Sequence, residues 1–409
     1  MTTSPDPADD DQLPPNDGTP AQDQPSASDP ANSASAEQSE NPSEGLPEWE
    51  PLTPELVEDE AIRGDFVIRW AIVGLALLFG FAPITDTRTL VHLKSGQYMA
   101  SHGFLPGVND VFSYTASDRR WVNLSWMFDL VAAGIYSFAG GIGLSILQAV
   151  LAAVAFGLLA NTYHREIRSW WGSVCAGLAL LVCYPYFTVQ PELITLVGIA
   201  AVLWLALQAE ESRQPRFLWM TVAVIWIWAQ FDIRAFLGWM LLMSFALGET
   251  LRRGEDAASR RALAWRVALA AFAVCVIHPC LWETWLSPVR LFAMDYPALR
   301  QVFPKPGPVE LAFFPITFPG FWTSINHGSI AAIVLFVATI VSLILNRERL
   351  HPGHVIAVLV FNLLGGLATH ELAAASLVNC VVCTLNAQAW YRHRFGQVYS
   401  IQWRELLFS

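Results

Sequence analysis

The sequence predicts an all-α fold: a polytopic bundle of about ten or eleven transmembrane helices. Of its 409 residues, 54% are hydrophobic and only 14% are charged. Soluble globular proteins average about 25% charged residues, so most of this chain cannot face water. Apolar stretches of membrane-spanning length recur from residue 66 onward. The six cysteines lie in or beside these stretches and lack metal-ligand or disulfide-framework spacing.

Residues 1–62 are predicted to be a disordered, acidic, proline-rich tail. They hold 16 of the 35 acidic residues, 11 prolines and no Lys or Arg. Such a segment buries too little apolar surface to offset the entropy lost on ordering. A docking role and a solvated leader without specific function both remain open. The rest of the chain has 19 acidic and 24 basic residues, with no basic patch that would indicate nucleic-acid binding.

Residues 63–391 are predicted to form the transmembrane domain. Its candidate helices are 66–84, 123–139, 142–162, 171–187, 191–208, 217–231, 235–251, 263–282, 328–346, 352–369 and 372–391. If the helices from 171 onward alternate, five arginine clusters fall on one side, which the positive-inside rule makes cytoplasmic. The long connections 85–122 and 283–327 are then extracytoplasmic, in a multi-pass protein of the inner (plasma) membrane.

The number of membrane crossings before residue 171 decides on which side each later loop lies, and this number depends on segments 123–139 and 142–162. If both cross fully, the alternation fails for everything downstream. We expect 123–139 to be short and re-entrant around Gly140 and Gly141; the alternative is that residue 1 lies outside.

The segment after the first span carries the candidate site. Leu90, Leu93, Tyr98 and Met99 form an apolar stripe at helical spacing, as expected of an amphipathic helix in the membrane interface. Asp86 stands where the preceding helix leaves the bilayer, and an ionisable residue at that depth is a functional candidate.

These residues carry a family resemblance. The pattern Asp86…His92-Leu93…Gly96…Gly103…Pro106…Asp110…Phe112-Ser113-Tyr114…Trp121…Trp126…Asp129 resembles the first extracytoplasmic loop of bacterial GT-C-type membrane glycosyltransferases, similar to the protein mannosyltransferase group. The resemblance implies a sugar donor carried on polyprenyl phosphate, with Asp86 as the base that deprotonates the acceptor.

The chain also departs from this pattern. Many relatives carry a second acid where this chain has Arg88, and a tryptophan where it has Val91. A guanidinium matches phosphate geometry, so Arg88 is a candidate for the donor phosphate. A decayed active site, with Asp86 a structural helix-end residue, is the other interpretation.

Further candidates each have a structural alternative. Asp110 is either a second catalytic acid or a turn residue, and His92 either contacts substrate or is satisfied by lipid headgroups. Glu192 either binds substrate or caps a helix. Asp129 needs a partner, for which Arg119 and Arg120 are candidates. The candidate substrate-binding residues are Arg88, His92, Lys94, Trp126, Glu192 and Trp282; no metal or cofactor is expected.

The sequence thus predicts a glycosyltransferase that uses a polyprenyl-phosphate-linked sugar and a glycan, lipid or protein acceptor. A non-catalytic membrane protein of the same fold that binds lipid-linked glycans is the main alternative. A transporter is disfavoured, because no internal repeat is evident.

Residues 392–409 end the chain with an amphipathic pattern in which Trp403, Leu406 and Leu407 share one face. Two interpretations are open: an interfacial helix at the natural end, or the start of a truncated extension.

Overall fold

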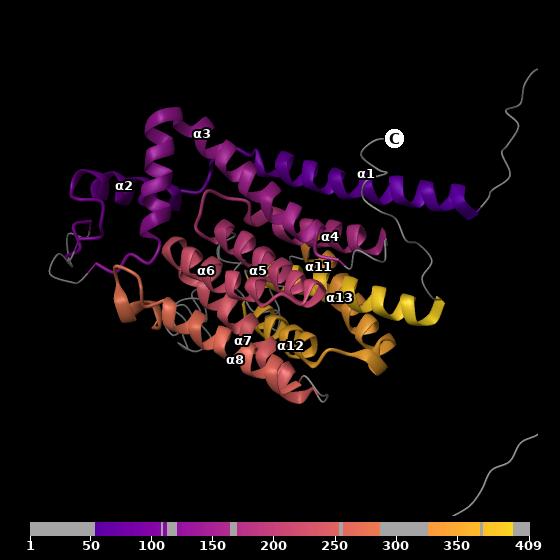
Figure 1. Cartoon of the computed structure of the whole chain (residues 1–409). Coiled ribbons are helices and arrows are strands. Elements are labelled where there is room, and N and C mark those ends of the chain that lie inside the picture. Colours follow the sequence, from indigo (N-terminus) through magenta and orange to yellow (C-terminus); the bar gives the residue numbers. More distant parts are fainter. Residues whose placement is uncertain are drawn as a thin grey trace, which may run out of the picture. The chain divides into compact units, whose positions relative to one another are not determined.

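The computed structural model describes residues 54–107, 109–112, 121–163, 170–252, 257–286, 326–368 and 371–395. These residues form eleven α-helices joined by turns and short 3₁₀ segments (Figure 1). The helices are α1 (Pro54–Gly80), α2 (Arg88–Ser101), α3 (Trp126–Ala160), α4 (Trp170–Cys183), α5 (Glu192–Ser212), α6 (Pro215–Phe231), α7 (Phe236–Leu251), α8 (Ala257–Val274), α11 (His327–Leu345), α12 (Pro352–Leu367) and α13 (Leu372–Phe395).

Four helices are long and apolar enough to cross a membrane: Trp126–Ala160, Glu192–Ser212, His327–Leu345 and Leu372–Arg394. The predicted helical class is therefore confirmed for the described residues. Many large apolar side chains on the helices are exposed, including Leu78 at 68% and Ile142 at 70%. Exposed apolar surface on this scale is unusual for a protein surrounded by water and is expected of helices that face lipid.

Contacts between distant segments define two ends of the bundle. At one end Arg234 contacts Glu192 and Glu371, which joins the starts of α5 and α13 to the α6–α7 connection. At the other end Glu249 near the end of α7 contacts His351 just before α12. Among the described residues, the helices from α4 onward run between these two ends; the side of a membrane that each end faces stays a prediction.

Helix α3 bends sharply at Gly140, which adopts φ 60° and ψ −152°. Only glycine takes this conformation without strain. Figure 1 shows the two limbs of α3, residues 126–139 and 141–160, running in different directions. The first limb is about 21 Å long at 1.5 Å per residue, short of the roughly 30 Å of a bilayer core. The limb has the short length expected for segment 123–139; its re-entrant placement stays a prediction.

Several predicted boundaries are wrong. Besides the three described next, α1 ends at Gly80 instead of 84, α4 at Cys183 instead of 187 and α5 at Ser212 instead of 208, and α8 begins at Ala257 instead of 263. Helix α1 begins at Pro54, inside the predicted tail, because proline fits the first turn of a helix, where its missing N–H is not needed. Residues 1–53 lie outside the described residues. Helix α8 ends at Val274 instead of 282, since the ring of Pro279 would clash with the carbonyl of residue 275 in a continuing helix.

The third boundary is the end of α13, which continues to Phe395 and carries three basic residues in its last turn. Cations there interact favourably with the helix dipole, which supports the extra turn. The predicted interfacial segment from 396 to 409 lies outside the described residues.

Helix α13 is largely buried and brings polar side chains into the bundle. The amides of Asn362 in α12 and Asn379 in α13 donate to each other at 2.8 and 2.9 Å. Asn346 donates to Asn386 at 2.8 Å. Buried amides in an apolar environment must be satisfied in this way, so these pairs fix the register between α13 and its neighbours.

Trp228 of α6 lies between two glycines. A Cβ on Gly198 of α5 would come within 2.4 Å of the indole, and one on Gly238 of α7 within 2.7 Å. The ring is 2% exposed, and its Nε1 donates to Thr195 at 3.0 Å. The two glycines therefore make the space in which Trp228 joins three helices.

We expect Gly198→Ala to lower the free energy of unfolding by about 1–3 kcal/mol, because the added methyl group overpacks against the indole. Thermal unfolding of the detergent-solubilised protein, followed by intrinsic fluorescence, measures this change. The matched control is Gly177→Ala in α4, where a Cβ would meet nothing within 4 Å. Equal melting temperatures of the two variants would contradict this packing.

Candidate functional site

Helix α2 lies directly against the first limb of α3. A Cβ on Gly96 would fall 2.0 Å from the carbonyl oxygen of Asp129, so only glycine permits this approach. The buried face of α2 includes Thr89, Leu93 and Met99. Of the predicted apolar stripe, Leu93 and Met99 lie on this buried face, whereas Leu90 is 62% exposed.

Asp86 and Arg88 form a tight pair at the start of α2. The carboxylate accepts hydrogen bonds from the Arg88 backbone N–H at 2.9 Å and from Nη2 of its guanidinium at 2.8 Å. Nε of Arg88 also donates, at 3.1 Å. Partial burial favours the neutral acid, but the hydrogen bonds from Arg88 outweigh it and lower the pKa of Asp86. The carboxylate is therefore ionised at neutral pH.

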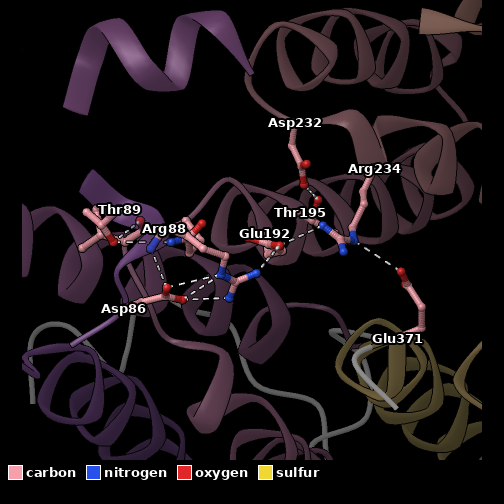
Figure 2. Close-up of polar contacts among 10 residues, drawn as sticks. Asp86, Arg88, Thr89, Glu192, Thr195, Asp232, Arg234 and Glu371 are labelled. Atoms are coloured by element: carbon pink, nitrogen blue, oxygen red, sulfur yellow. Dashed lines mark hydrogen bonds and ion pairs between the residues drawn. The ribbon is translucent and has the colours of Figure 1, made fainter. Parts of the chain in front are cut away.

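Arg88 begins a row of alternating charges that crosses the end of the bundle (Figure 2). Its Nη1 lies 3.8 Å from Oε1 of Glu192, the first residue of α5. Nη1 of Arg234 lies 3.1 Å from the same oxygen. Nε of Arg234 donates to Glu371 at 3.3 Å. The row thus joins α2, α5, the α6–α7 connection and the start of α13.

The members of this row differ in exposure. The side chains of Arg234 and Glu371 are 9% and 5% exposed, whereas that of Arg88 is 55% exposed. Asp232, next to Arg234, is buried and accepts a hydrogen bond from the Thr195 hydroxyl. The buried part of the row therefore holds helices together, and its exposed end at Arg88 is the part that a ligand can reach.

His92 lies one helical turn after Arg88 and contacts Asp129 of α3. Its Nδ1 is 2.6 Å from Oδ1 of Asp129. The other oxygen of Asp129 accepts hydrogen bonds from Ser95 at 2.5 Å and from Asn123 at 2.8 Å. The sequence correctly indicated that Asp129 needs a partner, but its partners in the structure are His92, Ser95 and Asn123; Arg119 and Arg120 lie outside the described residues.

The remaining predicted site residues make other contacts or are exposed. Lys94 points from the exposed face of α2, and Asp110 accepts from the Phe112 backbone N–H at 2.9 Å, as a turn residue does. Trp126 donates to Gln230 at 3.3 Å and links α3 to α6. Trp282 is 54% exposed on the short 3₁₀ segment Leu281–Thr284. The structure thus brings together Asp86, Arg88, His92 and Glu192.

A cavity of about 50 Å³ lies beside Asp232, with Trp239, Phe272 and Trp285 among its lining residues. For comparison, an engineered apolar cavity that binds benzene has a volume of about 150 Å³. As it stands, this cavity is too small for a sugar ring, so the exposed end of the charge row is the better candidate site.

Sequence reasoning missed several members of the site. Ser95, Asn123 and Glu371 were not among the candidate site residues. One signal was available: Arg88, His92 and Gly96 recur every four residues, which places them on one helical face. The glycine marks where that face meets a neighbour. Among the described residues no group of three or more His, Cys, Asp or Glu side chains is arranged to hold a metal ion.

Comparison with protein-family models and with curated protein sequences finds no match to this chain.

We expect Arg234→Met to destabilise the bundle by about 3–5 kcal/mol, since removing one partner of a buried ion pair leaves the other charges uncompensated. Glu192, Asp232 and Glu371 would then face one another without the guanidinium. The melting temperature in detergent measures the effect. Arg261→Met, at an exposed arginine of α8, is the control. A melting temperature for Arg234→Met as high as that of the control would show that the row does not hold the helices.

Proposed function

We propose that the chain is a membrane glycosyltransferase. It transfers a sugar from a polyprenyl-phosphate donor to a lipid, glycan or protein acceptor on the extracytoplasmic face of the inner (plasma) membrane, where it is a multi-pass protein. The proposal combines the resemblance of residues 85–130 to GT-C-type enzymes with the charged site at one end of an apolar helix bundle. A donor of this kind has an apolar chain and a phosphate headgroup, and the bundle and its end match these two parts.

One observation carries the proposal: Arg88 is an exposed guanidinium held in a fixed orientation at the end of the bundle. Two of its nitrogens, Nε and Nη2, donate to Asp86, and Nη1 faces Glu192 at 3.8 Å, too long for a hydrogen bond. Donors on Nη1 and Nη2 therefore remain for a ligand. A guanidinium binds phosphate through parallel hydrogen bonds, so Arg88 fits the donor phosphate.

The charge around Arg88 defines what the site can accept. Asp86 and Glu192 offset its charge in the resting protein, so the neighbourhood of Arg88 is not a strongly positive patch. A phosphate that replaces the loose Glu192 contact would meet donors already oriented by Asp86. In this proposal Asp86 and Arg88 act as a unit, and loss of either disturbs donor binding.

We expect Asp86→Asn and Arg88→Gln each to lower the rate of sugar transfer by about 100-fold, since each removes an oriented charge beside the reacting phosphate. The assay follows release of polyprenyl phosphate from polyprenyl-phosphate-linked mannose or glucose by the full-length protein in nanodiscs, with octyl glucoside as the hydroxyl acceptor.

Glu210→Gln is the matched control, because Glu210 is an exposed carboxylate near the opposite end of α5. Membrane levels and melting temperatures of all variants must match the wild type. Unchanged transfer by both site variants would remove the pair from the mechanism. Wild-type protein that binds the donor tightly but never releases polyprenyl phosphate would favour the non-catalytic binding protein.

The proposed topology places Lys94 outside and Glu210 in the cytoplasm, because α5 spans the distance between the two ends of the bundle. All six cysteines are buried; replacing them gives a cysteine-free background in which only an introduced cysteine can be labelled. We expect an impermeant maleimide to label Lys94→Cys in intact cells and Glu210→Cys only after permeabilisation. Labelling of both positions from the same side would overturn the topology.

A further inference from the structure

The His92–Asp129 contact has the geometry of an oriented base. Ser95 and Asn123 donate to one oxygen of Asp129, so this carboxylate is already satisfied on that side as an ionised acceptor. Its other oxygen, 2.6 Å from Nδ1 of His92, then accepts a hydrogen bond from the Nδ1–H of the ring. In the neutral imidazole this leaves Nε2 as the basic nitrogen. A carboxylate that fixes the tautomer of a histidine is the arrangement found behind the general base of hydrolytic triads.

The charges that surround His92 come from three elements. Asp86 and Arg88 lie on its own segment, Asp129 on α3 and Glu192 on α5. Burial disfavours the charged form, but the hydrogen bond and charge of Asp129 outweigh it and raise the pKa of His92 above 6.5. A base is most effective when its pKa lies near the working pH.

Asp86 is less suited to accept a proton. Its carboxylate is occupied by three donor groups of Arg88, the backbone N–H, Nε and Nη2. A proton on Asp86 would break these hydrogen bonds and leave Arg88 without its orienting partner. The side chain of His92 is 20% exposed, so part of the ring is open to a ligand, one helical turn from Arg88 on α2.

We propose that His92 is the proton acceptor of the transfer reaction, in place of Asp86, and that Asp129 positions it; this inference rests on the proposed glycosyltransferase function. The acceptor hydroxyl oxygen attacks the anomeric carbon and forms the new glycosidic bond. The bond from that carbon to the phosphate oxygen breaks, and polyprenyl phosphate leaves with the electron pair beside Arg88. Nε2 of His92 takes the hydroxyl proton, and the resulting imidazolium is stabilised by Asp129.

The test combines transfer rates and a titration on the full-length protein in nanodiscs, with polyprenyl-phosphate-linked mannose or glucose and octyl glucoside as probes. Because His92 must be neutral to act, kcat/KM of the wild type rises with pH through the pKa of His92. His92→Gln lowers kcat by about 100-fold or more and removes this rise. His102→Gln, at an exposed histidine stacked on Tyr98 beyond the end of α2, keeps both.

Asp129→Asn tests whether Asp129 positions His92. The quantities measured are the tautomer and the pKa of His92, which would not change if Asp129 only stabilised the fold. Nitrogen NMR of ¹⁵N-histidine-labelled protein, with His92 assigned by its loss in His92→Gln, reports the tautomer and pKa of the ring without any substrate. We expect the proton on Nδ1 and a pKa above 6.5 in the wild type. In Asp129→Asn we expect a lower pKa, and the rise of kcat/KM shifts to lower pH with it.

Each outcome decides the inference. Active wild type with a rate that does not change between about pH 5 and pH 8, the range in which histidine titrates, would overturn it even if the variants fail to fold. Folded His92→Gln with wild-type transfer would also overturn it and leave the glycosyltransferase function standing. Wild-type protein that transfers sugar from neither donor would overturn the proposed function itself, and the role of His92 with it.

Discussion

Charges at the end of an apolar helix bundle must be compensated locally, because neither lipid nor a packed core can solvate them. Arg234 meets this constraint by contacting Glu192 and Glu371 from two different helices. Glu192 in turn faces Arg88, which is held by Asp86. The positions of α2, α5 and α13 at this end therefore depend on one another. This row of ion pairs begins in the core and ends at the exposed guanidinium of Arg88. It supports the helix packing, and at its exposed end a ligand can compete with Glu192 for Arg88.

The contact between α2 and α3 is the second condition for the site. It depends on Gly96, which lets the backbone of α2 approach the first turn of α3. That approach brings His92 and Ser95 to Asp129, whose carboxylate lies inside an otherwise apolar helix. Arg88 and His92 then stand one turn apart on the same face of α2. In the proposed transfer from polyprenyl phosphate, the phosphate and the acceptor hydroxyl group would therefore meet different side chains of one helix.

Helix positions were predictable because the spacing and length of apolar runs can be read from the order of the residues along the chain. Helices α5, α6, α7, α11 and α12 begin within about two residues of their predicted positions. The boundaries that failed were set by local chemistry: Pro54 begins a helix inside an acidic segment, and Pro279 ends one early. The bend in α3 was anticipated at Gly140 and Gly141, since adjacent glycines are where a helix can change direction.

The sequence by itself determined that the chain is helical and apolar, that residues 86–129 carry a concentration of polar groups, and that Asp129 requires a partner. Those conclusions depend only on the residues within each segment and not on how the segments pack together. Only the tertiary structure decided which groups meet. Asp129 and His92 are 37 residues apart, and Arg234 and Glu371 are 137 apart. No spacing rule connects such positions, because their distance is set by how whole helices pack.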